Sequence, residues 1–557
     1  MEKFEQYVKF LYPRSAERIL QQIKSEINGD IQINTIAPND QWYRNIAMYA
    51  IYPDSLRKYN GTRLSQIAEH MKYVQKLGCN ALHILPFLES PMIDKGFDVS
   101  NFLQIREDLG SMHDIDAILQ KSKTTGIKVF MDLVFNHVSD QHVWFKKAQS
   151  GDEKYRDYFI HQKNKPLFDK KFHKESAVWA TYTINQKKED INIAFPEHTG
   201  EIPHWVQGTD GYWYYHTYFP EQIDVNWRNP DIFIEFAKIL IYWSKKGFNF
   251  RLDAIPFVGK GPYKNVDENT KFTKHLIASL RSLSHMINRE AVFIVESYEK
   301  ENTVIEYFGD SNVRQAELSY NFHLCTSLWV SLIMKNSEYI WEKLRSLKKI
   351  PNHGVWVNFL RNHDELSLAY LDQTTLKKVF SRLSPNGAPF REGYGISGRT
   401  YSLLDHDEKR FLNAYFLLSC MPGGILIPYG DEIGKVNVTS DSVDTRAINR
   451  GNLTKDEMDS SKAEKIRSKI QSFLNHRSVL NDYINVWPEK IPSPDSVYAA
   501  QYVAGSSKLI TLVNLSDTEQ KVEIKTDGYI LKNKLFSSSI ANDTITLSPF
   551  AGIWLQK

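Results

Sequence analysis

The sequence predicts an α/β protein: a (β/α)8 (TIM) barrel with an inserted subdomain after its third strand and an antiparallel β-sandwich at its C-terminal end. Short apolar runs alternate with amphipathic segments through the middle of the chain, as buried parallel strands alternate with helices. Eight such runs occur, the number that closes a barrel of this class. The connection after the third run is much longer than the others, which indicates an insertion.

The predicted strands are 46–51, 81–85, 129–134, 248–252, 292–295, 315–318, 355–360 and 424–427. Amphipathic segments separate them, for example 64–76, 115–123 and 272–287, in which apolar residues recur at helical spacing. The long connection between 134 and 248 predicts an inserted subdomain over 138–215 that lies above the mouth of the barrel.

The two ends of the chain have patterns of their own. Residues 1–41 predict an N-terminal helical segment, because apolar residues from Phe4 to Ile27 follow helical spacing. From about Val497 the chain reads as short alternating strands joined by turns. We therefore predict a barrel over 42–485 and a C-terminal β-sandwich over 486–557.

The composition excludes several classes of protein. Apolar residues make up 42% of the 557 residues, which excludes intrinsic disorder. The formal net charge of +3 gives no reason to expect nucleic acid or an anionic membrane as a partner. No apolar run is long enough to span a bilayer, and the first residues lack a signal-peptide pattern.

Cysteine usage points to a reducing environment. Cys79, Cys325 and Cys420 are far apart and form no CxxC pair, so we expect neither a disulfide framework nor a thiolate zinc site. We expect a cytoplasmic protein. Its oligomeric state is not predicted by the sequence.

Charged residues follow the predicted strands at the ends where barrels carry their chemistry. They are Asp132, Asn136 and His137 after the third strand, Arg251 and Asp253 in the fourth, Glu296 after the fifth, and Arg361, His363 and Asp364 after the seventh. Each alone has an ordinary structural explanation, such as an ion-paired strand end or a buried, hydrogen-bonded acid. Clustered together they are destabilising unless they have partners or a function.

Glycoside cleavage with retention requires such a set. It uses one carboxylate as nucleophile and another as general acid, about 5–5.5 Å apart. Asp253 and Glu296 lie on neighbouring strands, and Arg251 on the same face would hold the pKa of Asp253 down. The apolar run 292–295 would favour a protonated Glu296. Asp364 is then available to bind sugar hydroxyls.

Five segments resemble, in order, those that define the α-amylase superfamily, glycoside hydrolase family 13. They are Asp132–His137, Gln222–Asn226, Gly247–Ala254, Phe293–Glu296 and Phe359–Asp364. The resemblance covers the chain from about Trp42 to its C-terminus. It implies a small carbohydrate as substrate.

The resemblance also assigns roles to individual residues. It implies that Asp253 is the nucleophile, Glu296 the general acid/base and Asp364 the stabiliser of the transition state. Three further residues would contact the glucosyl ring: Arg251, His137 and His363.

Two further segments resemble those of exo-acting members. In Asp94–Phe97 the ring of Phe97 would stack under the sugar, and in Asp444–Arg450 the side chain of Arg446 would pair with Asp94 and close the pocket. Core packing for Phe97 and a solvated loop position for Arg446 are the structural alternatives.

The subfamily stays open at this point. Segments 137–145, 359–366 and 429–434 resemble trehalose synthase and its α-glucosidase relatives, whereas 52–56, 83–86, 222–230 and 446–450 resemble sucrose phosphorylase. All of these enzymes act on one terminal α-glucosyl unit. We expect hydrolysis or transfer of that unit through a covalent glucosyl-enzyme. Phosphorolysis and trehalose synthase-like transfer are alternatives, and a non-catalytic barrel scaffold is a remote one.

We expect no cofactor and no metal. Many exo-glucosidases carry an Asp-x-Asn-x-Asp calcium loop after the first strand, and the equivalent stretch here, 57–63, has no such series of oxygen ligands. Asn136 matches a calcium-binding position of some members, but bracing of the strand end by hydrogen bonds is the expected role.

Aromatic residues make up 13% of the chain. Most are expected in the core. Besides Phe97, the sequence suggests Trp144, Trp213, Tyr214 and Tyr215 as a rim of rings that holds sugar.

Overall fold

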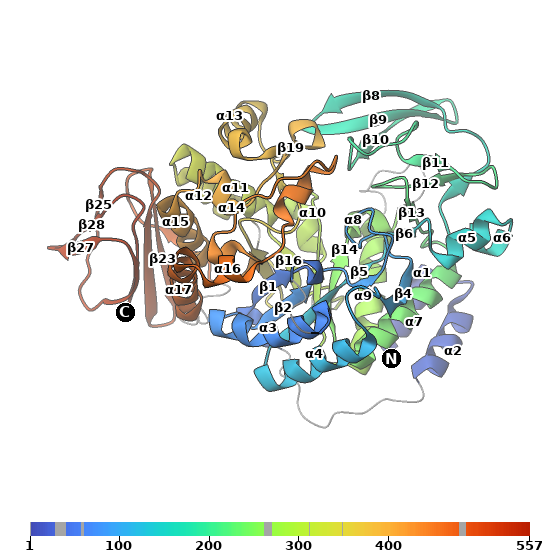
Figure 1. Ribbon diagram of the computed structural model, residues 1–557, viewed down its shortest axis with the longest axis horizontal. Helices are drawn as coiled ribbons and strands as arrows, with labels where there is room; N and C mark the ends of the chain where they lie inside the picture. Colours follow the sequence, from blue (N-terminus) through green and yellow to red (C-terminus); the bar gives the residue numbers. More distant parts are fainter. Residues whose placement is uncertain are drawn as a thin grey trace.

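The computed structural model describes residues 2–27, 41–56, 61–260, 270–310, 312–347, 349–477 and 486–557. Its centre is a closed barrel of eight parallel strands (Figure 1). In order these are β1 (Ala47–Ile51), β2 (Ala81–Ile84), β5 (Lys128–Val134), β14 (Asn249–Asp253), β15 (Phe293–Val295), β16 (Leu318–Tyr320), β17 (Val355–Asn358) and β21 (Gly424–Pro428). The fold class predicted from the sequence is confirmed.

Seven of these strands overlap their predicted ranges closely, and the sixth does not. It was predicted at 315–318 but forms at Leu318–Tyr320. Glu317, just before it, is buried, receives a hydrogen bond from the backbone N–H of Phe293 at 3.0 Å and pairs with Arg281. Its backbone still bonds to both neighbouring strands, whereas the backbone N–H of Gln315 donates to the carbonyl oxygen of Phe308, so the predicted start at 315 lies outside the strand ladder.

Helices surround the barrel. They include α3 (Arg63–Leu77), α4 (Met112–Thr125), α7 (Pro230–Lys246), α9 (Thr270–Ile287), α11 (Phe322–Met334), α12 (Glu338–Ser346), α15 (Glu408–Ser419) and α17 (Ser461–His476). Helix α7 begins at the Asn229 cap with Pro230 in its first turn. It ends at Gly247, whose φ of 102° is the left-handed conformation that glycine adopts at a helix end. This turn leads directly into β14, which carries Arg251 and Asp253.

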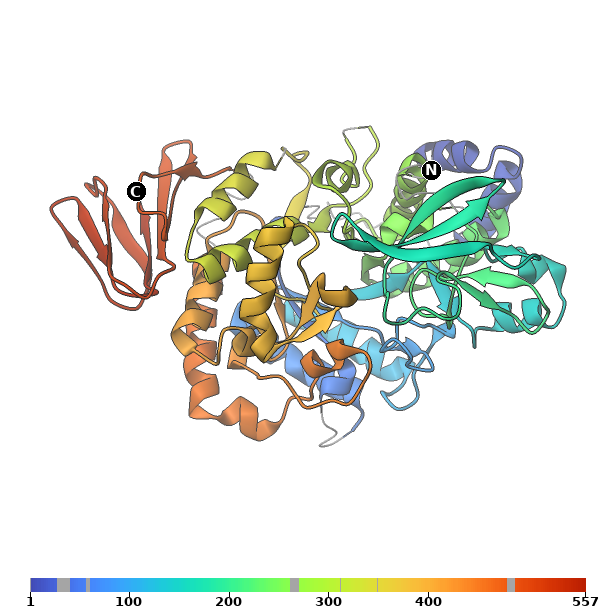
Figure 2. The same ribbon diagram turned by 90° about the horizontal axis from the view of Figure 1, so that it is seen from above.

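The long connection after β5 forms small antiparallel sheets over the barrel mouth (Figure 2). Its strands are β6 (His137–Ser139), β7 (His161–Gln162), β8 (Phe168–Lys174), β9 (Ala177–Ile184), β10 (Lys187–Ile193), β11 (Trp205–Gln207), β12 (Trp213–Tyr215) and β13 (Gln222–Asp224). Between β6 and β7 lie two short helices, α5 (Val143–Gln149) and α6 (Glu153–Arg156). The first and last strands pair with each other, so the insertion leaves and rejoins the barrel at one place. It contains the predicted range 138–215.

A second, smaller cover forms after β17. It consists of β18 (Leu366–Ser367), β19 (Ala388–Phe390) and β20 (Gly395–Ser397), with α13 (Gln373–Leu383) between the first two. On another side of the mouth, β3 (Leu88–Glu89) pairs with β4 (Asn101–Ile105). These loops carry residues to the same end of the barrel as the insertion does.

The N-terminal helices α1 (Glu2–Leu11) and α2 (Ala16–Ile27) pack against the outer helices α9 and α7 (Figure 1). The hydroxyl of Tyr12 donates to the carbonyl oxygen of Trp227 at 2.6 Å. The predicted boundaries at 41/42 and 485/486 adjoin residues 28–40 and 478–485, which lie outside the described residues.

The C-terminal part contains two antiparallel sheets, of order β22-β23-β24-β29-β26 and β25-β28-β27. These strands are Glu489–Lys490, Val497–Ala504, Ser507–Asn514, Gly552–Gln556 and Ile530–Leu535 in the first sheet, and Gln520–Glu523, Thr544–Leu547 and Ser538–Ala541 in the second. A separate apolar cluster is shared by the two sheets. The side chain of Asn413 in α15 donates to the carbonyl oxygens of Asn514 and Phe550, which joins this part to the barrel.

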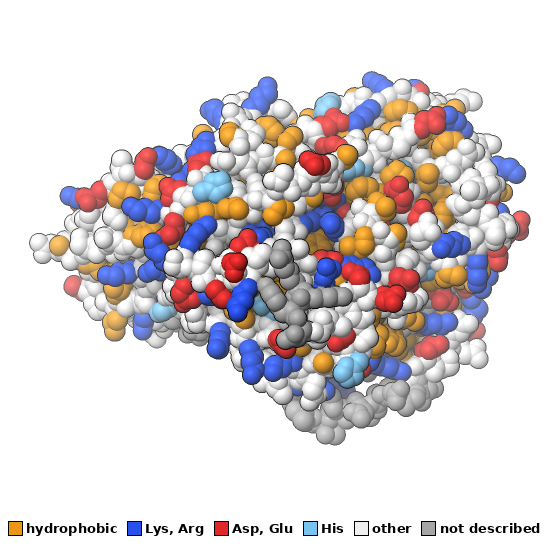
Figure 3. Space-filling model, viewed as in Figure 1, with side chains coloured by type: hydrophobic (Ala, Val, Ile, Leu, Met, Phe, Trp, Pro, Cys, Tyr) orange, Lys and Arg blue, Asp and Glu red, His pale blue; other side chains and the backbone are white. Residues whose placement is uncertain are grey.

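The surface agrees with the near-zero net charge. Acidic and basic side chains are interspersed over the face seen in Figure 3. Among the residues that the structure describes, we find no helix with the length and apolar character required to cross a bilayer.

Candidate active site

The charged residues predicted at the strand ends converge at the mouth of the barrel. In the sheet register Arg251 of β14 lies beside Asp132 of β5 on one side and Ile294 of β15 on the other. The neighbouring strand β15 ends at Val295, so Glu296 leaves it at the level of Asp253.

Arg251 is the centre of this cluster. Its Nη1 atom lies 2.7 Å from Asp132 Oδ1 and 2.7 Å from Asp253 Oδ1, and its Nη2 atom lies 2.5 Å from Glu296 Oε1. The arginine side chain is only 1% exposed, so these contacts are shielded from water. One guanidinium therefore bridges the two acids proposed for catalysis.

The protonation of Asp253 differs from the prediction. Burial raises its pKa well above the ordinary value, and the charges of Glu296, Asp132 and Asp364 add to that effect. Arg251 lowers the pKa but does not outweigh the burial and the neighbouring carboxylates. The expectation that Arg251 holds the pKa of Asp253 down is wrong.

Glu296 is oriented by two hydrogen bonds of its own. Its Oε2 atom accepts from the backbone N–H of Ala254 at 3.3 Å, and its Oε1 atom accepts from the hydroxyl of Tyr298 at 3.2 Å. Ala254 has a φ of 51°, a conformation that non-glycine residues rarely adopt. That turn directs its N–H toward the acid.

Asp364 has strongly cationic surroundings. Its Oδ1 atom lies 3.0 Å from Arg446 Nη1 and 2.9 Å from Arg450 Nη2, and its Oδ2 atom lies 3.1 Å from His363 Nε2. Burial alone would raise the pKa of Asp364, but His363, Arg446 and Arg450 together hold it well below its ordinary value. Asp364 is therefore ionised.

The ion pair expected between Asp94 and Arg446 is present, with 2.8 Å between Oδ1 and Nη2. Arg446 also pairs with Asp444, at 2.8 Å from Nε, and its guanidinium carbon lies 4.5 Å from the ring centre of Phe195. With a side-chain exposure of 3%, Arg446 is a buried wall residue and not a solvated loop cation.

Phe97 and His137 lie side by side in the same wall. The ring of Phe97 stacks on that of His363, with 5.2 Å between centroids and 14° between planes. His137 Nε2 lies 3.2 Å from the carbonyl oxygen of Phe97 and 3.0 Å from Nε2 of Gln222. Burial lowers the pKa of His137 to about 4, so its ring is neutral near pH 7.

These residues enclose a small pocket of about 390 Å³, measured with its opening. It is lined by Asp94, Phe97, His137, Phe195, Tyr218, Asp253, Tyr298, His363, Asp364, Glu365, Arg391 and Arg446. Of the residues predicted for the site, Arg251 and Glu296 lie directly behind this lining, in contact with Asp253 and Tyr298 respectively.

Comparison with known proteins identifies the family. The family model described as "Alpha amylase, catalytic domain" matches residues 50–382. The chain belongs to the α-amylase family. It is a glycoside hydrolase or transglucosylase of the family 13 type, for which retention of configuration is characteristic.

The curated relatives include trehalose synthases. The enzyme of Pimelobacter sp. (strain R48) is 28% identical over 406 residues, which are 71% of this chain and 67% of that protein. The enzyme of Thermus thermophilus is 27% identical over 399 residues, 71% of this chain and 38% of that protein. The trehalose-6-phosphate hydrolase of Escherichia coli is 31% identical over 225 residues, 40% of this chain and 37% of that protein. The matches thus span about two thirds of these relatives or less.

Solved structures support the fold. An α-amylase from H. orenii superposes with a TM-score of 0.70 at 19% identity, over 92% of this chain and 99% of that one. The trehalose-6-phosphate hydrolase of Bacillus licheniformis gives 0.69 at 19% identity with the same coverage. At these identities the likeness concerns the α-amylase fold.

Five lining residues were not among the predicted site residues: Phe195, Tyr218, Tyr298, Glu365 and Arg391. Phe195 and Tyr218 come from the insertion, outside the segments that carry the family resemblance, so nothing in the sequence singled them out. Tyr298 lies two residues after Glu296, and that spacing was a usable signal: its hydroxyl contacts the acid.

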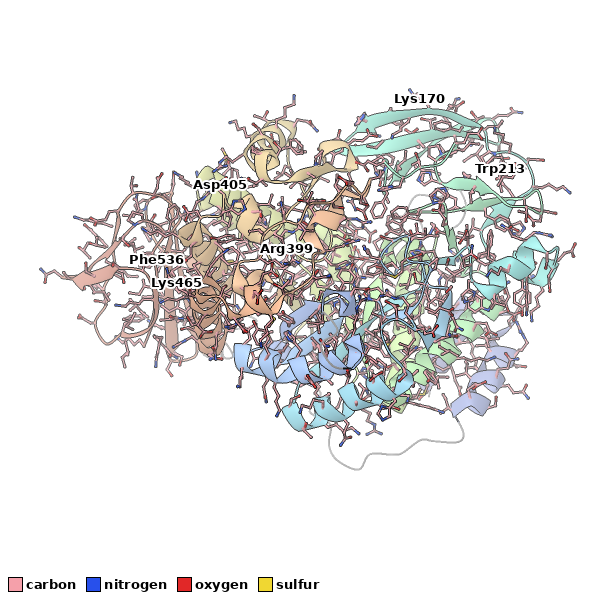
Figure 4. All side chains as sticks on the ribbon, in the orientation of Figure 1. Lys170, Trp213, Arg399, Asp405, Lys465 and Phe536 are labelled. Carbon is pink, nitrogen blue, oxygen red and sulfur yellow. The ribbon has the colours of Figure 1, made fainter. Side chains whose placement is uncertain are left out.

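The predicted aromatic rim is mostly wrong. Trp144 packs against Phe102 and Tyr158, and Tyr214 packs against Phe145, all in the interior. Trp213 is buried in the apolar cluster of the insertion, in the sheet formed by β7, β11 and β12 (Figure 4). These rings fill the core of the insertion, the usual place for large aromatic side chains. The fourth ring, Tyr215, lines a chamber next to the pocket.

Asn136 lies just after the end of β5, where it forms a hydrogen bond with Lys260. Lys260 Nζ lies 2.6 Å from Asn136 Oδ1 and 2.5 Å from Asp224 Oδ2, so the ammonium occupies the space between the two oxygen ligands. These residues do not fit a calcium ion, because the lysine already neutralises Asp224. Within the described ranges no cluster of three or more His, Cys, Asp or Glu residues is arranged to hold a metal. The stretch 57–63, where relatives carry a calcium loop, is described only from residue 61 onward.

Four arginines near the catalytic acids separate into two groups. Arg391 and Arg446 line the pocket. Arg361 and Arg399 line a different cavity beside it, with Tyr52 and Asp431 (Arg399 is labelled in Figure 4).

Proposed function

We propose that this enzyme cleaves or transfers the terminal α-glucosyl unit of a small glucoside through a covalent glucosyl-enzyme formed on Asp253. One observation carries the proposal. Asp253 and Glu296 leave neighbouring strands and are bridged by Arg251 beside a small pocket that the Asp94–Arg446 pair closes. A pocket closed at one end suits a single terminal unit.

In the first step the carboxylate of Asp253 attacks the anomeric carbon. The bond from that carbon to the glycosidic oxygen breaks, and Glu296 gives its proton to the leaving oxygen. In the second step the oxygen of water or of a sugar hydroxyl attacks the same carbon. The ester bond to Asp253 breaks, and the proton of the attacking group goes to Glu296.

When Asp253 attacks it must be ionised, and Glu296 must carry the proton that it gives to the leaving oxygen. The raised pKa of Asp253 means that its ionised form is costly in the empty pocket. The positive charge that develops on the sugar ring in the transition state stabilises this ionised form.

We assign the remaining wall residues to the glucosyl ring. Asp364 is ionised and oriented by His363, Arg446 and Arg450, so it can bind hydroxyl groups and offset the charge of the transition state. The neutral ring of His137 can hydrogen-bond to a hydroxyl, and Phe97 offers an apolar surface to the sugar.

Charge pairing favours water or a sugar over phosphate as the acceptor. Arg446 contacts three carboxylates, and Arg391 pairs with Glu365 at 3.1 Å. The charges of both arginines in the pocket lining are thus already neutralised by carboxylates. A phosphate dianion in the pocket would lose its hydration and would find no free positive charge in return.

Trehalose synthase-like transfer is the second candidate. Relatives named trehalose synthase match over 71% of this chain. In that case the leaving glucose would stay beside the glucosyl-enzyme and return through a different hydroxyl.

The deciding experiment is a product assay with sucrose, maltose, trehalose and isomaltose, each with and without phosphate. We expect glucose or a rearranged disaccharide from at least one substrate, independent of phosphate. Glucose-1-phosphate that appears only with phosphate would contradict the proposal. An inactive wild-type enzyme on all α-glucosides would do so as well.

We also propose a cytoplasmic location. Its support is that Cys79, Cys325 and Cys420 are buried free thiols, as is usual for proteins of reducing compartments.

A further inference from the structure

A chamber larger than the glucosyl pocket adjoins it. It lies between the insertion and the loops of the barrel mouth, and it measures about 1670 Å³ with its opening. Arg391, Tyr218 and Tyr298 line both spaces. A ligand that extends from the pocket into the chamber therefore passes Arg391.

The chamber has mostly apolar and aromatic walls, which include Trp179, Ile193, Tyr215, Phe257, Tyr370 and Tyr394. Its charged lining residues are of both signs: Glu175, Glu299, Lys260, Lys300 and Arg391. Lys260 pairs with Asp224, and Arg391, which lies at the boundary with the pocket, pairs with Glu365. The wall next to the pocket therefore has no uncompensated charge and suits an uncharged ligand.

The backbone at Arg391 is strained. Arg391 has a φ of 51° and Glu392 has a φ of 52°, both in the left-handed region, and only the next residue, Gly393 at 93°, is a glycine. Two successive non-glycine residues in this region persist only where the surrounding structure holds them, and such strain concentrates at functional sites.

The insertion holds this loop in place. The carboxylate of Glu392 lies 2.5 Å from Lys171 Nζ and 3.1 Å from His173 Nε2, and both partners belong to β8. The backbone N–H of Glu392 donates to Glu197 at 2.6 Å. We call the contacts of the Glu392 carboxylate with Lys171 and His173 the Glu392 clasp.

The clasp holds the guanidinium of Arg391 at the boundary between the pocket and the chamber. Its Nε atom lies 3.1 Å from Glu365 Oε1, and its central carbon lies 5.1 Å from the ring centre of Tyr298. Gly395 makes room for Glu365, because a Cβ atom there would lie 2.8 Å from Glu365 Cγ. The Nε atom of Arg391 and the Oε1 atom of Glu365 are buried without a hydrogen-bond partner among the described residues, so the guanidinium keeps donors for a ligand.

We propose that Arg391 is a specificity-determining residue: it donates hydrogen bonds to the hydroxyl groups of an uncharged sugar next to the scissile bond. The Glu392 clasp positions it for this contact. The proposal rests on the function proposed above, since that sugar is the leaving group of the first step or the acceptor of the second. Glu365 compensates the charge of Arg391, so Arg391 selects neutral hydroxyl groups over an anion.

The test compares two donors in the intact enzyme. One is the best disaccharide found in the product assay, and the other is α-glucosyl fluoride, which has no second sugar. In Arg391→Met we expect kcat/KM for the disaccharide to fall about 10- to 100-fold, the loss expected for hydrogen bonds from a charged donor. We expect kcat/KM for the fluoride to change less than about threefold. The control is Arg382→Met, which removes an arginine that pairs with Asp405 outside both cavities.

Two results would overturn the proposal. The first is an unchanged ratio of kcat/KM between the two donors in Arg391→Met, whether neither activity falls or both fall equally. The second is a wild-type preference for a 6-phosphorylated disaccharide that disappears in this variant, since Arg391 would then recognise an anion. An inactive wild-type enzyme on both donors contradicts the proposed function itself, which keeps the two failures distinct.

The clasp is tested as a positioning device. Glu392→Gln should lower the disaccharide-to-fluoride ratio of kcat/KM in the same direction as Arg391→Met. The charge exchange Lys171→Glu with Glu392→Lys should restore the ratio to within about threefold of wild type. A ratio that Glu392→Gln leaves unchanged would show that the clasp does not position Arg391.

Discussion

Arg446 donates a hydrogen bond to Asp94 at 2.8 Å although 352 positions separate the two in the sequence. The same guanidinium lies 3.0 Å from Asp364 and 2.8 Å from Asp444. The residue that closes the pocket therefore also orients Asp364, the acid that we assign to the transition state.

Replacing Arg446 by Met should remove both effects. We expect kcat/KM to fall about 100-fold or more, because Asp364 loses a partner that orients it. The free energy of unfolding should fall by about 3–5 kcal/mol, since buried carboxylates lose their counter-ion. Steady-state kinetics and urea unfolding measure the two losses. Arg382→Met, whose salt bridge is at the surface, should change stability by about 1 kcal/mol or less. Unaltered kinetics in Arg446→Met would contradict this role.

The raised pKa of Asp253 predicts a pH dependence of stability. The folded state holds this proton more tightly than the unfolded state, so the contribution is complete at low pH and is lost as pH rises through the folded pKa. Each pH unit in that window lowers the unfolding free energy by about 1.4 kcal/mol. Asp253→Asn removes the titrating group. Its stability relative to wild type should therefore increase from pH 4 to pH 7 in urea unfolding.

Asp364 provides the matched control with the opposite sign. Its folded pKa is lowered, so its contribution is present above the unfolded pKa and is lost as pH falls through the folded one. Asp364→Asn should therefore be less stable than wild type at pH 7. If both variants followed the same pH trend, the assignment of the two charge states would be wrong.

Lys260 should make the enzyme independent of calcium. Its ammonium lies between Asn136 and Asp224, and burial of all three shields the pair from water. Millimolar calcium or a chelator should leave the melting temperature of the wild type unchanged. Lys260→Ala should lose about 3–5 kcal/mol of stability. Calcium should restore part of it, because the two oxygen ligands are then free. A wild type stabilised by calcium would contradict this account.

The aromatic residues separate into sugar-binding and structural sets. Phe97 lines the pocket, whereas Trp213 packs in the interior of the insertion. Phe97→Ala should raise KM for the best disaccharide about 10-fold or more, as expected for a lost apolar contact surface of this size. Trp213→Phe should leave KM within about twofold and lower only the thermal stability. A KM effect at Trp213 comparable to that at Phe97 would contradict the assignment.

The sequence predicted the barrel well because its strands are apolar on both faces. Runs such as Val129–Val134 have few other structural explanations, and polar residues directly after them identified Asp253, Glu296 and Asp364. The Asp94–Arg446 contact could be expected only through the family resemblance, because no local pattern links positions so far apart.

Other features depend on packing in three dimensions. The raised pKa of Asp253 follows from its burial and from the carboxylates around it, and neither can be read from the sequence. Trp144 and Tyr214 looked like binding residues because composition does not distinguish core rings from exposed ones. The left-handed conformation of Arg391 and Glu392 has no sequence signal, since neither residue is a glycine.

The central claim is that Asp253 forms a covalent bond to the glucosyl unit. The most direct test incubates Glu296→Gln with α-glucosyl fluoride, whose leaving group needs no acid, and analyses the protein by mass spectrometry. Without the general base the second step is slow, so the account predicts a stable adduct of one glucosyl unit on the peptide that contains Asp253. An adduct on another residue, or turnover of the fluoride by Asp253→Asn at the wild-type rate, would contradict it.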